Sequence, residues 1–153
     1  MKQIFFLFLC MFIASACTAV NNKKLEYTGD EIDVKFKKIQ KYITNYEVEG
    51  GGPILDNVIK IYTIDRDQCV IVSKIEGDSG VYGTESILYF SKSKILYGYR
   101  YNYSYSFYNG EGSNKVDKLN YSNPLLPIDE IELKKIFNTF KVGFNQKTKN
   151  ECG

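Results

Sequence analysis

The side chains that most often carry out acid–base chemistry are scarce in this chain of 153 residues, which contains no histidine. Without histidine the chain lacks the commonest general base near neutral pH and every nucleophile system that depends on one. Carboxylates do occur in two close pairs, Asp65 with Asp67 and Glu76 with Asp78. Paired carboxylates can hydrolyse glycosides, but both pairs fall between predicted strands, where acidic residues are typical of turns. We therefore expect a protein without catalytic activity.

The four cysteines lie at positions 10, 17, 69 and 152, a spacing that does not indicate a zinc site. We expect neither a metal nor a cofactor. The first cysteine belongs to an apolar run at residues 4–13, which follows Lys2 and is too short for a helix that spans a bilayer. Small residues follow, Ala14-Ser15-Ala16. This pattern predicts a signal peptide at residues 1–16.

The stretch Ser15-Ala16-Cys17 resembles the end of the lipobox of bacterial lipoproteins, although Ala14 stands where leucine, valine or isoleucine is commoner. The resemblance implies that Cys17 becomes the first residue and carries acyl chains, which would anchor the protein to a membrane. Thr18 follows the cysteine, and a lipoprotein without aspartate at that position resembles outer-membrane rather than inner-membrane members. We expect a location in the cell envelope, at the outer membrane facing the periplasm. The alternative is simple cleavage after Ala16, which gives a soluble secreted or periplasmic protein.

With one cysteine in the signal peptide and Cys17 lipidated, Cys69 and Cys152 remain. An even pair in an oxidising compartment predicts a disulfide. It would join the middle of the chain to its last residues. The alternative is two free thiols.

The composition favours one ordered domain at residues 28–153, preceded by a polar tether at residues 17–27. Apolar residues make up 44% of the chain and charged residues 25%, which allows a packed core. The formal net charge is only +2 and no basic run stands out, so nucleic acid is not expected as a partner.

The first element of the domain is predicted to be a helix that begins at Thr28, where Glu31 completes capping-box spacing. One apolar stripe at helical spacing follows, formed by Ile32, Phe36, Ile39, Ile43 and Tyr46. Lysines occupy the opposite side at positions 35, 37, 38 and 41. Such a helix packs on a core or touches anionic lipid headgroups. The glycines at residues 50–52 end it.

The centre of the domain is predicted to be a sheet. Alternating, β-branched or aromatic runs indicate strands at residues 58–64, 68–75, 85–91, 95–108 and 115–121. Short turns between them indicate an antiparallel meander of four or five strands. A second helix begins at Asp129, buries Leu133, Ile136, Phe137 and Phe140, and stops at Gly143. The fold class is therefore α+β, and both helices are expected on one face of the sheet.

An aromatic row distinguishes the fourth predicted strand. Its members stand at every second position, on one side of the strand: Tyr97, Tyr99, Tyr101, Tyr103, Tyr105 and Phe107. The row either packs under the helices as core or, from Tyr101 to Tyr108, forms an exposed platform for a partner. The candidate contacts for a partner are Tyr99, Tyr101, Tyr103, Tyr105, Tyr108, Tyr82 and Arg100.

The overall layout resembles small periplasmic immunity proteins and inhibitors of lysozyme or proteases. This resemblance implies that the chain binds and neutralises a protein partner, a toxin or a hydrolase. The alternative function is a structural or polysaccharide-binding envelope lipoprotein that would stack peptidoglycan or another glycan on the same rings.

Overall fold

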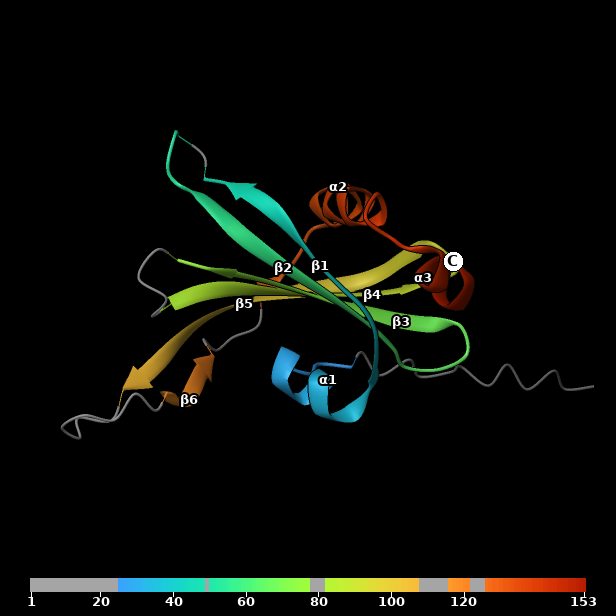
Figure 1. Ribbon diagram of the computed structural model, residues 1–153, viewed down its shortest axis with the longest axis horizontal. Helices are drawn as coiled ribbons and strands as arrows, with labels where there is room; N and C mark the ends of the chain where they lie inside the picture. The colour runs from blue at the N-terminus through green and yellow to red at the C-terminus, as the bar shows by residue number, and fades with distance from the viewer. Residues whose placement is uncertain (1–24, 49, 78–81, 108–115, 122–125) are drawn as a thin grey trace, which may run out of the picture.

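The computed structural model describes residues 25–48, 50–77, 82–107, 116–121 and 126–153 (Figure 1). The predicted signal peptide, Cys17 and the tether up to residue 24 lie outside these residues, as do Tyr108 and the side chain of Tyr105. Within the described ranges, no helix combines the length and apolar character that a membrane span requires.

A twisted antiparallel sheet forms the centre of the described chain (Figure 1). Six of its seven described strands follow one another in sequence order, as in the predicted meander, and the short β7 pairs with β5. The α+β class is therefore confirmed, with more strands than predicted. The strands are β1 (Lys37–Glu47), β2 (Ile54–Thr63), β3 (Gln68–Glu76), β4 (Tyr82–Ser91), β5 (Lys94–Phe107), β6 (Val116–Tyr121) and β7 (Leu126–Pro127).

The predicted N-terminal helix is correct at its start and wrong in its length. Helix α1 (Gly29–Lys35) begins at the capping box of Thr28 and Glu31, but the chain then turns into β1, which pairs with β2 along its whole length. The steps of three in the stripe would place residues on opposite faces of a strand, so the spacing alone favoured a helix. Pairing with β2 outweighs that local preference, and the predicted basic amphipathic helix does not form at residues 37–47.

The helices lie on opposite faces of the sheet, which contradicts the expectation that they share one face (Figure 1). Helix α1 covers one face, and helices α2 (Glu130–Lys141) and α3 (Gln146–Cys152) cover the other. The core under α1 consists of Ile32, Tyr62, Val70, Val72, Ile87, Tyr89, Tyr99 and Tyr101. The core under α2 and α3 consists of Ile39, Ile59, Ile61, Cys69, Ile71, Leu88, Phe90, Ile128, Leu133, Phe137, Phe140, Phe144 and Cys152.

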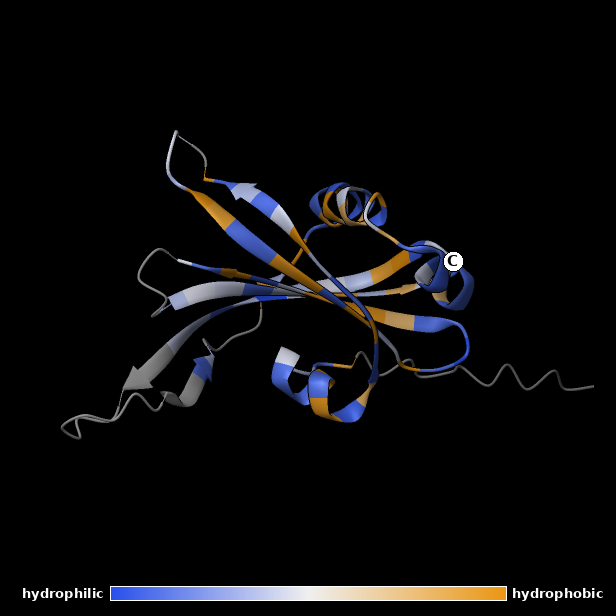
Figure 2. Cartoon of the chain, viewed as in Figure 1, coloured by the Kyte–Doolittle hydropathy of each residue, from blue (hydrophilic) through white to orange (hydrophobic). Residues whose placement is uncertain are grey.

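Strand β3 lies where both faces are covered, and its residues 69–73 are all buried. A strand buried on both faces has no polar side, which explains the continuous hydrophobic run there. Figure 2 shows this concentration of hydrophobic residues in the middle of β2 and β3, between the helices. The β1–β2 hairpin projects beyond α2 (Figure 1).

The C-terminal elements follow the sequence closely. The Asp129 side chain accepts hydrogen bonds from the backbone N–H groups of Ile131 and Glu132 and so caps α2. The tail after Gly143 forms α3, capped by Asn145, and the predicted disulfide between Cys69 and Cys152 holds it to the sheet. Both sulfur-bearing residues are buried, with exposed fractions of 0% and 2%.

We expect loss of the disulfide to detach α3 and lower the free energy of unfolding. The bond closes a loop with a sequence separation of 83. In the chain-entropy model, closing such a loop stabilises the folded state by about 4 kcal/mol. Urea unfolding of the Cys152→Ala variant, followed by circular dichroism, measures the difference. The parent protein treated with dithiothreitol is the control and should unfold at the same lower midpoint. Equal midpoints for the variant and the untreated parent would contradict this role.

Candidate functional site

From Tyr97 to Tyr103, the aromatic row of β5 packs in the core on the α1 side of the sheet. The exposed fractions are 5% for Tyr99, 5% for Tyr101 and 3% for Tyr103. An exposed platform that includes Tyr101 and Tyr103 is therefore wrong, and the core alternative holds for these rings. The row stacks on its neighbours, with 4.6 Å between the ring centroids of Tyr89 and Tyr97.

The row consists of tyrosine rather than phenylalanine because its hydroxyl groups bind backbone. The N–H of Leu25 donates to the Tyr97 hydroxyl at 2.9 Å, and the N–H of Tyr27 donates to the Tyr99 hydroxyl at 2.7 Å. The Tyr103 hydroxyl donates to the carbonyl oxygen of Ile75 at 3.3 Å. The backbone at residues 25–27 thus lies along the row and helps to exclude water from it.

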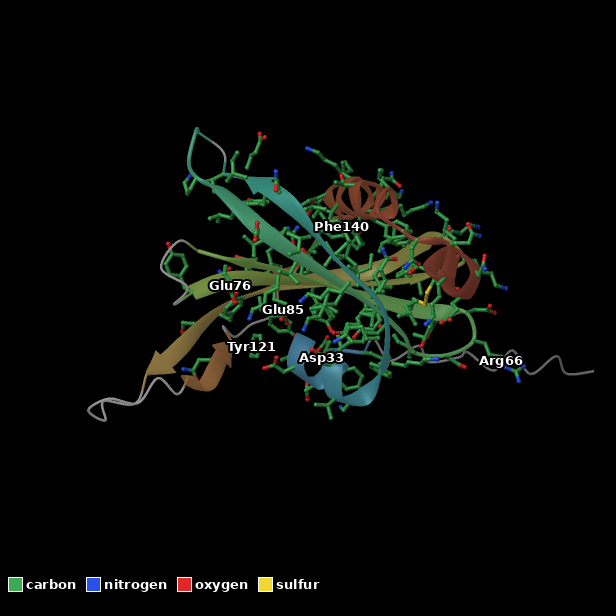
Figure 3. All side chains as sticks on the ribbon, in the orientation of Figure 1. Asp33, Arg66, Glu76, Glu85, Tyr121 and Phe140 are labelled. Atoms are coloured by element: carbon green, nitrogen blue, oxygen red, sulfur yellow. A yellow bond between two sulfur atoms is a disulfide. The ribbon has the colours of Figure 1, made fainter. Side chains whose placement is uncertain are left out.

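A buried carboxyl group connects this face of the sheet to α1. Glu85 is 2% exposed and accepts a hydrogen bond of 2.7 Å from the N–H of Gly29. A side chain at Gly29 would overlap the Glu85 carboxyl, so glycine permits the contact. Figure 3 places Glu85 on the α1 side, with Asp33 and Tyr121. Burial, helped by the negative charge of Asp30, raises the Glu85 pKa to about 7.

A second carboxyl group fastens the other end of α1. Asp33 accepts hydrogen bonds from Lys60 at 2.6 Å, from the Tyr62 hydroxyl at 2.8 Å and from Lys38 at 3.2 Å. Burial acts to raise the Asp33 pKa, but these three donors outweigh it and lower the pKa to about 2. These contacts are structural: they hold a short helix against the sheet.

The opposite face carries a groove, because α2 and α3 leave part of it uncovered. The groove has a volume of about 550 Å³ and lies between α2 and strands β1 to β5. Phe140 and Ile136 of α2 form its apolar wall. Figure 3 places Phe140 on this side, away from the Glu85 cluster. Cavities of this size hold a small ligand or a few side chains of a protein partner.

The floor of the groove is polar although it is buried. Asn57, Ser73 and Ser86 are 5%, 3% and 8% exposed. The Ser73 hydroxyl donates to the Asn57 side-chain oxygen at 2.7 Å, whereas the Asn57 amide nitrogen makes no hydrogen bond within the described chain. Among the described residues, the Tyr121 hydroxyl is the one buried side-chain polar atom without a partner, so the Asn57 amide nitrogen reaches solvent in the groove, where a ligand can accept a hydrogen bond from it.

Strand register assembles the floor. Ser73 is the direct neighbour of Ser86, and Ser86 is the direct neighbour of Arg100, across three adjacent strands. The Arg100 guanidinium donates to the Ser86 hydroxyl at 3.3 Å and to Glu132 of α2 at 2.7 Å. The arginine therefore bridges the sheet and the helix at the groove. Lys135, one helical turn after Glu132, lines the same wall.

Two tyrosines stand at the rim. Tyr82 is 59% exposed and Tyr46 is 42% exposed, and both line the groove. The Tyr82 ring lies against Gly77, and the N–H of Gly77 donates to the Tyr82 carbonyl oxygen at 2.9 Å. The contact with Gly77 thus partly fixes the position of the Tyr82 ring at the rim.

Of the residues predicted to contact a partner, the groove brings together Tyr82 and Arg100, while Tyr99, Tyr101 and Tyr103 lie on the other face. Sequence reasoning missed the rest of the site, namely Tyr46, Asn57, Ser73, Ser86, Glu132 and Lys135. One signal was present in the sequence. Predicted strands 58–64, 68–75 and 85–91 each have a polar residue inside or beside an apolar run, a pattern that marks a polar strip across a sheet.

The groove residues support binding rather than covalent chemistry. The groove serines contact an amide and a guanidinium, neither of which acts as a base. Among the described residues, no group of three or more cysteine, aspartate or glutamate side chains could hold a metal ion. Comparisons of the chain with family models, curated proteins and solved structures found no match.

We expect the buried Glu85 carboxyl to make folding less stable as pH rises. The folded-state pKa of about 7 exceeds the ordinary value of 4.5. Between these values the unfolded chain loses the proton that the folded chain keeps, so stability falls with rising pH, then levels off above 7. The loss is on the order of 3 kcal/mol.

Urea unfolding of the parent and of Glu85→Gln at pH 4.5, 6 and 8 measures this effect. The glutamine keeps an acceptor for the Gly29 N–H, and its stability should change much less across the interval. Parallel pH profiles for the two proteins would exclude Glu85 as the source.

Proposed function

We propose that the protein is a non-catalytic binding protein of the cell envelope that holds a protein partner in the groove beside α2. Proteins of the immunity or inhibitor type act in this way, by covering a toxin or a hydrolase. The observation that carries the proposal is the groove itself, with its polar floor at Asn57, Ser73 and Ser86 and with Arg100 joining that floor to α2. The Asn57 amide nitrogen donates to no group of the described chain, so a bound segment can accept a hydrogen bond from it.

The residue types around the groove support a protein partner. Tyrosine and arginine are the residues that most often dominate the energy of protein interfaces. Tyr46 and Tyr82 offer exposed rings at the rim, and Arg100 bridges the floor to α2. Because the groove is formed by paired strands and a packed helix, binding would order few additional groups.

A glycan is the second candidate for the groove. Planar polar side chains such as Asn57, Arg100 and Glu132 can bind neighbouring sugar hydroxyls, and the rim tyrosines could stack on a sugar ring. Peptidoglycan would then be the natural ligand in the envelope. This alternative shares the groove with the first candidate and differs in the partner.

The location in the envelope rests on the proposed lipid at Cys17, so the anchor can be tested directly. We expect the full chain to sediment with membranes in a Gram-negative host, and the Cys17→Ala variant to lose that association while remaining folded. Membrane fractionation with detergent release measures the difference. Cys10→Ala is the matched control, because it removes a cysteine from the apolar run and leaves Cys17 in place. Equal sedimentation of the Cys17→Ala variant and the parent would refute the anchor.

We expect a stoichiometric protein to co-purify with the parent from envelope extract, and the double variant Tyr46→Ala/Tyr82→Ala to reduce its binding at least tenfold. Both rings are exposed, so the melting temperature should change little. The control is Val34→Ala, which removes an exposed side chain from α1 on the opposite face. Unchanged capture by the double variant would place the interface elsewhere. Retention on purified peptidoglycan, without a protein partner, would support the second candidate.

A further inference from the structure

We infer that the groove selects an acidic segment, so that a carboxylate side chain of the protein partner enters it and binds Arg100 and Asn57. This inference rests on the proposed function and specifies the chemistry of the partner. It follows from the charge of the groove and from the balance between hydrogen-bond donors and acceptors along its walls.

The charged groups of the groove are Arg100, Lys135 and Glu132. Two cations and one carboxylate leave a net charge of +1. Glu132 already pairs with Arg100 at 2.7 Å, whereas the Lys135 ammonium has no ion pair within the described chain. A ligand with a negative charge would balance this surplus, and the field of the groove would attract it from solution.

The uncharged groups point to the same class of ligand. The Asn57 oxygen already accepts from Ser73, which leaves the two amide hydrogens of Asn57 as donors toward the groove. The Ser86 oxygen accepts from Arg100 at 3.3 Å, so its hydrogen is available to a ligand. The floor and the arginine therefore offer mainly donors. A carboxylate, which only accepts, satisfies donors without bringing any of its own.

Arg100 is oriented before any ligand binds. One of its N–H groups is directed at Ser86 on β4 and another at Glu132 on α2, which fixes the plane of the guanidinium between sheet and helix. Its other N–H groups make no hydrogen bond within the described chain. An oriented guanidinium with free N–H groups can bind a carboxylate through two hydrogen bonds, the strongest arrangement for such a pair.

A neutral glycan fits these groups less well. Each sugar hydroxyl brings a donor that needs an acceptor, and Glu132 is the one carboxylate among the described groove residues. A carboxylate side chain also leaves the rim tyrosines free to contact the apolar parts of the partner's segment. Charge and hydrogen bonding therefore both favour an acidic peptide over a neutral sugar.

The test is a titration of the detergent-solubilised, isotope-labelled full chain with two peptides, followed by NMR. The peptides are acetyl-Tyr-Glu-Tyr-amide and acetyl-Tyr-Gln-Tyr-amide, which differ only in the central carboxylate. We expect the glutamate peptide to shift the Asn57 amide and Arg100 guanidinium signals saturably. The glutamine peptide should bind at least tenfold more weakly, and 0.5 M salt should weaken the glutamate peptide.

Three exposed side chains of α2 give variants with opposite expectations. Lys135→Gln should weaken binding of the glutamate peptide about threefold or more. Glu132→Gln keeps a side-chain oxygen that can accept from Arg100 but removes the competing negative charge, so it should strengthen binding. Lys134→Gln is the matched control, because Lys134 pairs with Glu130, and neither side chain lines the groove. None of the three side chains is buried, so folding does not confound the comparison.

Equal binding of the two peptides, or weaker binding to Glu132→Gln, would overturn the inference. So would saturable binding of N-acetylglucosamine in the groove with no binding of the glutamate peptide, an outcome that supports the glycan. The captured partner separates this failure from failure of the proposed function. A partner lost by Tyr46→Ala/Tyr82→Ala but retained by Lys135→Gln removes only the acidic specificity, whereas a partner retained by both removes the groove as the interface.

Discussion

The sheet has two faces to cover, and the helices that cover them are much shorter than its strands. Strand β5 has 14 residues and helix α2 has 12, which correspond to about 46 Å of strand and about 18 Å of helix. Helices α1 and α3 have only 7 residues each. No single helix can therefore exclude water from a whole face. The two faces meet this constraint in different ways, and the difference produces both the core under α1 and the groove beside α2.

On the α1 face, large aromatic side chains complete the cover. The rings of Tyr99, Tyr101 and Tyr103 lie beside one another, and their hydroxyl groups would be costly to bury without partners. The Tyr99 hydroxyl is paired with the backbone at residues 25–27, and that of Tyr103 with Ile75 of β3. The Glu85 carboxyl is likewise buried with a partner, because it accepts a hydrogen bond from the N–H of Gly29. The Tyr99 hydroxyl and the Glu85 carboxyl thus each also fix a segment that lies over the sheet.

On the α2 face, the uncovered part of the sheet carries polar residues instead. The side chains that would be apolar under a longer helix are Asn57, Ser73 and Ser86, and Arg100 joins them to α2 through Glu132. Gly98 lies in the adjacent covered part, where a larger side chain would meet Leu133 at 2.6 Å. The even positions of β5 therefore change from close helix contact at Gly98 to groove lining at Arg100. The small residue Gly98 permits close packing of α2, and the polar residue Arg100 lines the groove.

Much of the fold could be predicted from local patterns, because strands β2 to β5 are β-branched or aromatic runs separated by turns and the helix caps have typical residues. The disulfide could be predicted because Cys69 and Cys152 are the two cysteines left after the signal peptide and the lipid anchor are assigned. The strand at residues 37–47 could not be predicted, because its apolar spacing fits a helix and its pairing with β2 is not visible in the local pattern. Cross-strand register makes Ser73, Ser86 and Arg100 neighbours, and no single strand encodes that register. The face that each helix covers likewise depends on the assembled sheet.

The two ends of the sheet are held by different contacts, and this difference affects how a ligand could bind. The disulfide between Cys69 and Cys152 and helix α3 lie at one end, whereas the groove opens toward the β1–β2 hairpin at the other (Figure 1). The hairpin turns at Gly50 and Gly51, whose φ angles of 89° and 83° suit glycine. The cross-link fastens α3 to β3 at that end, while backbone pairing sets the strand register that aligns the groove floor. A ligand at the open end therefore meets a floor whose geometry is set before it arrives, which reduces the ordering that binding would otherwise require.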